Sequence, residues 1–173
     1  MNTETKSKFG VGGIWTFEQV RDGKVIDTWE DHNIVVDESI NYILNTSFFN
    51  ATANPSWFVG LFKNNFTPVA SNVMSTFGSA GVANEATSEY SQSTRPAWSI
   101  VSSTAKSLTN IASPATFTFT PTSTVIFGAF LSSSSVKGGT TGVLGSAIKF
   151  PASRTLLTGD SLNVVYSLTG SST

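Results

Sequence analysis

The residues best suited to chemistry lie in a short acidic segment around the single histidine. Asp27, Glu30, Asp31 and His32 fall within six positions, and their carboxylate and imidazole groups are common metal ligands. The segment reads as a strand, however, and along a strand Asp27 and Asp31 face opposite to Glu30. We therefore predict solvated charges at a strand edge rather than a metal site.

Two other groups of residues invite a chemical interpretation. Glu85 and Glu89 could act as the paired carboxylates of a glycosidase, but nothing in the sequence around them fixes their separation. With no cysteine and one histidine, thiol chemistry and multi-histidine metal sites are excluded. We predict that the protein is not an enzyme and has no cofactor.

Four tryptophans could form a sugar-binding platform, although their neighbours favour the core: Trp15, Trp29, Trp57 and Trp98.

The polar content of the chain consists of hydroxyl groups rather than charges. Among 173 residues there are 26 serines and 23 threonines, against 10 basic and 11 acidic side chains. The charged fraction of 12% is about half the average of roughly 25%. Threonine favours strands, so the composition predicts an all-β domain with a nearly neutral surface.

The charges are divided unevenly along the chain. Residues 1–90 carry 5 basic and 10 acidic side chains, whereas residues 91–173 carry 5 basic and 1 acidic. We expect the halves to interleave and partly cancel; the alternative is a bipolar molecule that stacks on its own copies. The net charge of −1 argues against nucleic acid as a partner, and the lack of a long apolar run argues against a membrane.

Strand patterns dominate the sequence. The pair Asp22-Gly23 predicts a tight hairpin turn within residues 14–29, because both central residues of such a turn need positive φ. Further strands are expected at residues 56–63, 97–101, 124–131 and 143–150, the last of them ended by Pro151. Five alternating side chains are expected to face the core: Phe117, Phe119, Leu162, Val164 and Tyr166.

One short helix is expected over about residues 37–46, with Asp37 as its N-cap and its apolar face against one end of the sandwich. Together these elements predict a single β-sandwich domain over residues 14–173, with a jelly-roll-like topology. The strand at residues 56–63 is apolar on both faces and is expected to be central.

Residues 1–13 are predicted to form a flexible arm, because the glycines between residues 10 and 13 leave it little to fold against. Phe9 and Val11 would anchor this arm on a partner. The polar loops at residues 70–90 and 132–142 are further candidate docking segments. A negative patch on a partner could use three basic side chains: Lys137, Lys149 and Arg154.

Three stretches follow one another in a characteristic order. The first joins GIWTFE (13–18), DGK (22–24), Trp29, NIVVDE (33–38) and NYIL (41–44). The second joins WFVGLF (57–62), EY (89–90) and TRPA (94–97), and the third joins FGAFL (127–131), KGGTTG (137–142) and TGDSLNV (158–164). In this order they resemble a family of small virion proteins of tailed bacteriophages, and they cover most of the chain.

The resemblance implies a non-enzymatic structural protein that binds the major capsid protein and decorates and cements the exterior of the capsid. It also implies a homo-oligomer on the virion, made in the host cytoplasm, and it transfers no catalytic residues. The alternatives are a neck, tail or fibre-base component, or a carbohydrate-binding module for host attachment. A sugar-binding module would need two exposed aromatic rings on one surface.

Overall fold

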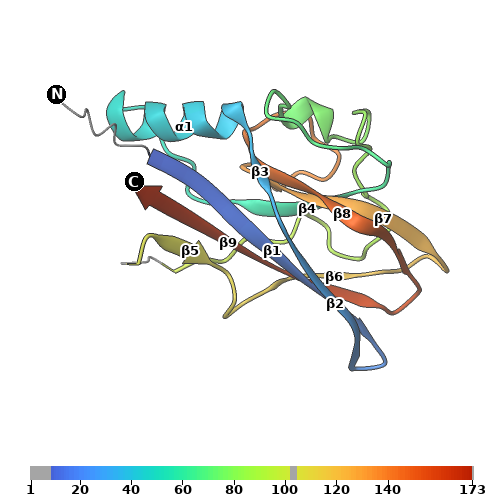
Figure 1. Ribbon diagram of the computed structural model, residues 1–173. Helices are drawn as coiled ribbons and strands as arrows, with labels where there is room; N and C mark the ends of the chain where they lie inside the picture. Colours follow the sequence, from blue (N-terminus) through green and yellow to red (C-terminus); the bar gives the residue numbers. More distant parts are fainter. Residues whose placement is uncertain (1–8, 102–104, 173) are drawn as a thin grey trace.

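The computed structural model describes residues 9–101 and 105–172, which form two antiparallel sheets packed face to face (Figure 1). The first sheet has the order β2-β1-β9-β5, and β6 also pairs with β9. Its strands are β1 (Phe9–Arg21), β2 (Lys24–His32), β5 (Ser107–Thr109), β6 (Ala115–Thr118) and β9 (Ser161–Ser172). The second sheet has the order β3-β8-β7-β4. Its strands are β3 (Ile34–Val35), β4 (Phe58–Phe62), β7 (Thr124–Ser132) and β8 (Leu144–Leu156). The predicted all-β sandwich is confirmed, and the jelly-roll topology stays a prediction.

Two helices accompany the sheets. Helix α1 (Asp37–Phe48) is two residues longer than expected, and the short 3₁₀ helix η1 (Met74–Thr76) follows β4. The N-cap of α1 is Val36 rather than Asp37, which instead lies in the first turn, where a carboxylate stabilises the helix dipole. Glu38 accepts hydrogen bonds from the backbone N–H of Met74 (3.1 Å) and of Leu144 (2.8 Å). These bonds tie the start of α1 to the second sheet.

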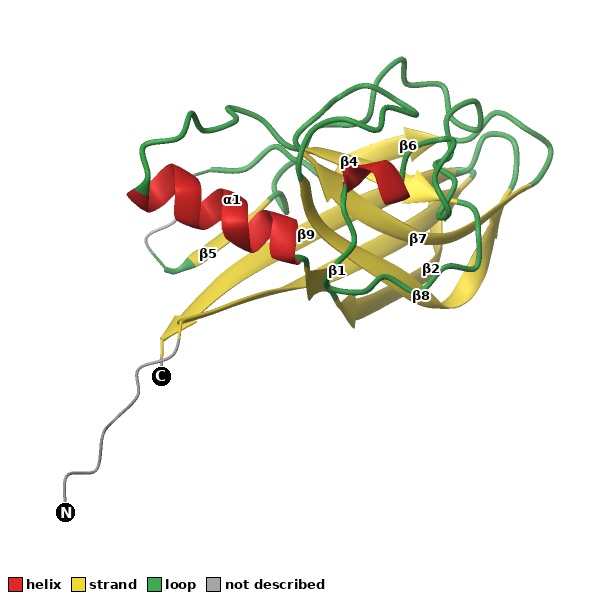
Figure 2. Ribbon diagram, turned by 90° about the horizontal axis from the view of Figure 1, so that it is seen from above, coloured by secondary structure: helices red, strands yellow, loops and turns green. Residues whose placement is uncertain are grey.

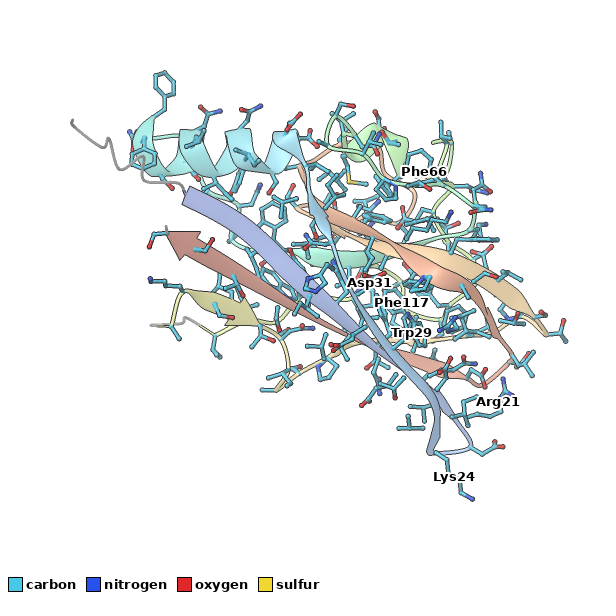
Figure 3. The ribbon with its side chains drawn as sticks, viewed as in Figure 1. Arg21, Lys24, Trp29, Asp31, Phe66 and Phe117 are labelled. Carbon is cyan, nitrogen blue, oxygen red and sulfur yellow. The ribbon has the colours of Figure 1, made fainter. Side chains whose placement is uncertain are left out.

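The hairpin between β1 and β2 has the turn that the sequence predicts. Asp22 and Gly23 have φ values of 50° and 73°, and Arg21 pairs with Lys24 across the turn. Lys24 extends from the tip of the hairpin, away from the sandwich (Figure 3). The turn places the whole of β2 alongside β1, with Ile14 opposite His32 at the far end of the ladder.

The main apolar core lies between the two sheets and is rich in aromatic rings. Phe17 stacks on Trp29 at 5.2 Å and meets Phe150 edge-on at 4.7 Å, while Trp15 stacks on Tyr166 at 4.3 Å. The five alternating side chains predicted to face inward are all buried: Phe117, Phe119, Leu162, Val164 and Tyr166.

A second apolar cluster covers the outer face of the second sheet. Met74 and Phe77, from the segment after β4, pack there with Phe62 and Phe130. Met74, Phe77, Ala83 and Ala86 of the segment at residues 70–90 are thus buried in the fold, whereas Val73 and Val82 are exposed. That this segment docks on a partner stays a prediction. The expectation that the strand at residues 56–63 is central is wrong, because β4 is the last strand in the order of its sheet. Its outer face is covered by this second cluster, which explains why β4 is apolar on both faces.

Two predicted strand limits are wrong. Strand β8 continues through Pro151 to Leu156. It can do so because the register of its pairing with β7 shifts at this point: Gly128 pairs with Lys149 and Ile126 with Arg154, and Pro151 lies between these two pairs. A proline is tolerated at such an irregularity, where no ladder hydrogen bond is required of it. Residues 97–101 form no strand; only Ala97 makes an isolated bridge, to Phe58.

Residues 9–13 of the predicted arm belong to a strand. Strand β1 begins at Phe9, and residues 9–13 pair with residues 168–172 of β9, so the expected domain boundary after residue 13 falls inside a strand. Residues 1–8 lie outside the described residues. The sequence pattern missed this pairing because glycine-rich strands carry little periodicity.

Candidate docking surfaces

Three of the acidic residues considered for catalysis or metal binding are engaged in separate ion pairs. Glu85 pairs with Arg95 at 2.7 Å, Glu89 with Lys63 at 2.7 Å, and Asp27 with Arg154 at 2.9 Å. Within residues 9–101 and 105–172, no group of three histidine, aspartate or glutamate side chains is placed to hold a metal ion. Glu85 and Glu89 thus each face a cation of the chain itself.

The charges of the two halves of the chain do interleave. The described residues contain four ion pairs, and three of them join one half to the other: Arg21–Asp160, Glu85–Arg95 and Asp27–Arg154. This confirms the expectation that the opposite charges of the two halves partly cancel within one domain.

Arg95 anchors the loop at residues 132–142, which the sequence suggested as a docking segment. Besides its ion pair with Glu85, Arg95 donates hydrogen bonds to the hydroxyl of Ser132 (3.2 Å) and to the carbonyl oxygens of Ser134 (2.8 Å) and Gly139 (3.0 Å). Glu85 accepts a hydrogen bond from the backbone N–H of Gly138 at 2.7 Å. The loop is therefore held from within by a buried ion pair.

Lys137, one of the predicted partner-binding residues, makes its contacts inside the protein. Its ammonium group lies 3.8 Å from the centre of the Tyr90 ring and donates hydrogen bonds to the carbonyl oxygens of Tyr90 (3.2 Å) and Gln92 (2.8 Å). Desolvation lowers the pKa of Lys137, against the opposing attraction of Glu85 and Glu89. Lys137 therefore stabilises the packing of the protein itself, whether or not a partner is bound.

The other two predicted basic residues lie in separate interactions. Lys149 is partly exposed and donates a hydrogen bond to the hydroxyl of Thr67 at 3.3 Å. The guanidinium group of Arg154 lies 4.3 Å from the centre of the Trp29 ring and pairs with Asp27. The three basic residues thus make no common contact, and each serves a different part of the sandwich.

The tryptophans do not form the sugar-binding platform that the sequence left open. Trp15, Trp29 and Trp98 are buried, and Trp57 is half-buried against the core. The indole N–H of Trp98 donates to the carbonyl oxygen of Tyr166 at 2.9 Å, so its polar atom is also engaged inside the protein. The expectation that these rings pack in the core is confirmed.

Strands β1 and β9 extend beyond the other strands as a two-stranded ribbon, on which the C-terminus lies (Figure 2). Among the described residues, β2 covers the outer side of β1 only from Ile14 onward. The carbonyl oxygen of Gly13 accepts a hydrogen bond from Asn33 on that side. Because backbone groups alternate along a strand, those of Phe9 and Val11 also point to this uncovered side.

The predicted anchors of the arm lie on this ribbon. Val11 is half-buried and lines an apolar groove with Ile43 of α1 and Leu168 of β9. The side chain of Phe9 lies outside the described part of the structure. Thus the backbone of Val11 faces outward along the sheet edge, while its side chain contributes to the surface beneath the helix.

Helix α1 carries an exposed apolar surface that the sequence reasoning missed. Ile43 and Ser39 face the sandwich, whereas Ile40 and Leu44 are 42% and 46% exposed and Phe48 is 85% exposed. Phe49, just after the helix, is 81% exposed. We call these four residues, Ile40, Leu44, Phe48 and Phe49, the helix patch. The prediction that the whole apolar face of the helix covers the sandwich is therefore wrong, because only one of its sides does.

One sequence signal could have identified the helix patch. Residues 39–62 contain no charged side chain, although they include all but the first two residues of α1 and the loop that follows it. Charged residues are depleted, and aromatic residues enriched, at the centres of protein–protein interfaces. A long uncharged segment with two consecutive phenylalanines is thus a better indication of a contact surface than a polar loop.

A pocket of about 190 Å³ lies between α1 and the sandwich, beside the helix patch. Its walls are mostly apolar, and Trp57, Trp98 and Leu108 contribute to them with Tyr42 of the helix. The hydroxyl oxygen of Tyr42 accepts a hydrogen bond from the backbone N–H of Asn54, which holds the loop after α1 against the helix. At this end of the molecule an apolar pocket therefore lies next to four exposed apolar side chains.

Comparison with models of known protein families gives no match. Comparison with curated proteins gives no match either. None of the helices in residues 9–101 and 105–172 combines the length and the apolar character needed to cross a membrane.

Proposed function

We propose that the protein is a non-enzymatic structural component of a tailed-phage virion, which binds the major capsid protein on the outside of the capsid and reinforces it. The resemblance of the three sequence stretches supports the virion setting. The open edge of β1 at residues 9–12 supports docking, and the proposed binding mode rests on this observation.

An open strand edge offers a partner a row of unpaired backbone groups. A strand of the capsid protein would add to β1 beside Phe9 and Val11 and continue the first sheet onto the particle. Backbone hydrogen bonds supply affinity in such complexes, and they need few charges. This mode fits a chain in which only 12% of the residues are charged.

The abundance of the protein in purified particles tests its position in the virion. Hundreds of copies would support decoration of the capsid, whereas a ring of about six to twelve copies would favour the neck or tail. Absence from purified particles would overturn the virion assignment altogether.

A proline at the outward-facing position tests the docking mode. Val11→Pro removes an N–H that points away from β9, and proline is tolerated on the open side of an edge strand. We expect this variant to lose binding to particles. Val11→Ala is the matched control, because it also removes the side chain from the groove but keeps the N–H. Equal binding by both variants would overturn strand addition.

The salt dependence of binding to particles distinguishes strand addition from electrostatic binding. Binding through the strand edge should persist from about 0.1 to 1 M salt, although the Debye length falls from about 10 to about 3 Å. Release over that range without unfolding would favour a role for Lys137, Lys149 and Arg154 instead.

One observation supports the carbohydrate-binding alternative. Phe48 and Phe49 are consecutive residues, and both rings are exposed. Titration with oligosaccharides of the host surface, followed by the amide spectrum of the labelled protein, tests it. Changes confined to these residues would favour host attachment over capsid docking.

A further inference from the structure

We infer that the helix patch is a contact between two copies of this chain, in which α1 packs against α1 of a second molecule around a twofold axis. The inference goes beyond the proposed function and does not depend on it, because it concerns the protein alone. The contact is formed by the four residues of the patch: Ile40, Leu44, Phe48 and Phe49.

The spacing of the patch fits a helix–helix contact. Ile40, Leu44 and Phe48 are four residues apart and therefore form one ridge along the helix. Ridges of this kind on two helices interlock at a crossing angle of about −50°, the commonest packing class in globular proteins. In a twofold arrangement the same ridge serves both helices, and Leu44 at its centre lies next to its own counterpart.

The charge distribution favours a second copy over a charged partner. Two identical surfaces that face each other repel wherever they carry unpaired charges of one sign. Residues 39–62 carry no charge, so α1 from Ser39 onward and the following loop present nothing that would repel their own image. The two acidic residues of α1, Asp37 and Glu38, lie in its first turn, about two turns from Leu44. The net charge of −1 adds almost no long-range repulsion between the molecules.

The exposed area is also close to what a dimer needs. Aromatic side chains bury about 150–250 Å² each, so Phe48 and Phe49 leave roughly 300 Å² of apolar surface in solvent. With the half-exposed Ile40 and Leu44, two facing copies would bury roughly 900–1,000 Å², near the lower bound for a specific interface. The expected dimer is therefore weak and dependent on concentration.

The mass of the full-length protein, measured by sedimentation over a range of concentrations, tests the inference. We expect a reversible monomer–dimer equilibrium. Leu44→Glu and Phe48→Glu should each raise the dissociation constant by about 30-fold or more, as expected for a central interface residue. Ile111→Glu is the matched control, because Ile111 is 70% exposed and lies in the loop between β5 and β6, away from α1.

A charge-reversal pair makes the test specific for the twofold contact. Leu44→Glu and Leu44→Lys should each be monomeric, and their equimolar mixture should form a dimer of one copy of each. Circular dichroism confirms that each variant is folded, and Phe48→Glu guards against misfolding because Phe48 is almost fully exposed.

Three outcomes would overturn the inference. The first is a wild-type protein that stays monomeric at its highest soluble concentration. The second is a dimer that persists in both Leu44→Glu and Phe48→Glu, which would place the contact elsewhere. The third is a monomer that binds purified particles only when the helix patch is intact, which would assign the patch to the capsid.

Discussion

Glu85 and Arg95 form a two-point ion pair that neither side chain shares with solvent. Nε of Arg95 donates to Oε1 of Glu85 at 2.7 Å, and Nη2 donates to Oε2 at 2.7 Å. Both side chains are 0% exposed, and the guanidinium group also lies 5.2 Å from the centre of the Phe130 ring. Both residues lie in the segment after β4, and their further hydrogen bonds to Ser134, Gly138 and Gly139 connect this segment to the loop after β7.

Removing one member of this pair should destabilise the protein strongly. Glu85→Gln leaves the Arg95 charge buried without its counterion, which typically costs about 3–5 kcal/mol. Urea unfolding measures the loss. Lys63→Met is the control, because the Lys63–Glu89 pair is partly exposed and should contribute about 1 kcal/mol or less. Equal losses in the two variants would contradict a special role for the buried pair.

The alternating aromatic residues in β6 and directly after it should be essential to the core. Phe117→Ala and Phe119→Ala each remove a buried ring and should lower the free energy of unfolding by about 3–5 kcal/mol. Ile111→Ala, at a 70% exposed position, should change it by about 0.5 kcal/mol or less. A loss below about 1 kcal/mol in both phenylalanine variants would contradict their burial between the sheets.

Gly128 should not tolerate a side chain. A Cβ atom there would lie 2.1 Å from the carbonyl oxygen of Ile148 and 2.2 Å from the ring of Phe62, so Gly128→Ala should cost about 1–3 kcal/mol. Gly12→Ala is the matched control in another strand, because its Cβ would meet nothing within 4 Å. The control should be neutral or slightly stabilising in thermal unfolding. Equal stability of both variants would contradict the close approach at Gly128.

Acid should weaken the junction between the β1–β2 hairpin and the turn before β9. The Arg21 guanidinium and further donors, including Gln19, lower the pKa of Asp160 from 3.8 to about 2. A lowered pKa stabilises the folded state at pH values above the unfolded pKa, and this contribution is lost as the pH falls from about 4 to about 2.

The size of this effect is about 1–2 kcal/mol, because Arg21 is partly exposed and solvent screens the pair. Asp160→Asn should abolish that part of the pH dependence in urea unfolding, whereas Glu18→Gln, at an exposed position, should retain it. An unchanged acid transition in Asp160→Asn would assign the acid sensitivity to other carboxylates.

Local patterns in the sequence were sufficient to predict much of the fold. The Asp22-Gly23 turn depends on two neighbouring residues, and the alternation at Phe117 and Phe119 depends on residues two positions apart. The scarcity of charge is a property of composition and predicts the nearly neutral surface directly. Features of this kind need no knowledge of distant contacts.

Other features were decided only by the tertiary structure. Glu85 and Arg95 are polar residues in a weakly patterned stretch, and only their approach in space makes them a buried pair. Lys137 resembles a surface residue in sequence, but it is placed over Tyr90 by the path of a distant loop. Likewise, the helical spacing of Ile40, Leu44 and Phe48 shows that they share a ridge, while only the position of α1 on the sandwich shows that the ridge faces solvent. The physical reason is that burial depends on which segments meet, and segments far apart in the chain meet through contacts that no local pattern encodes.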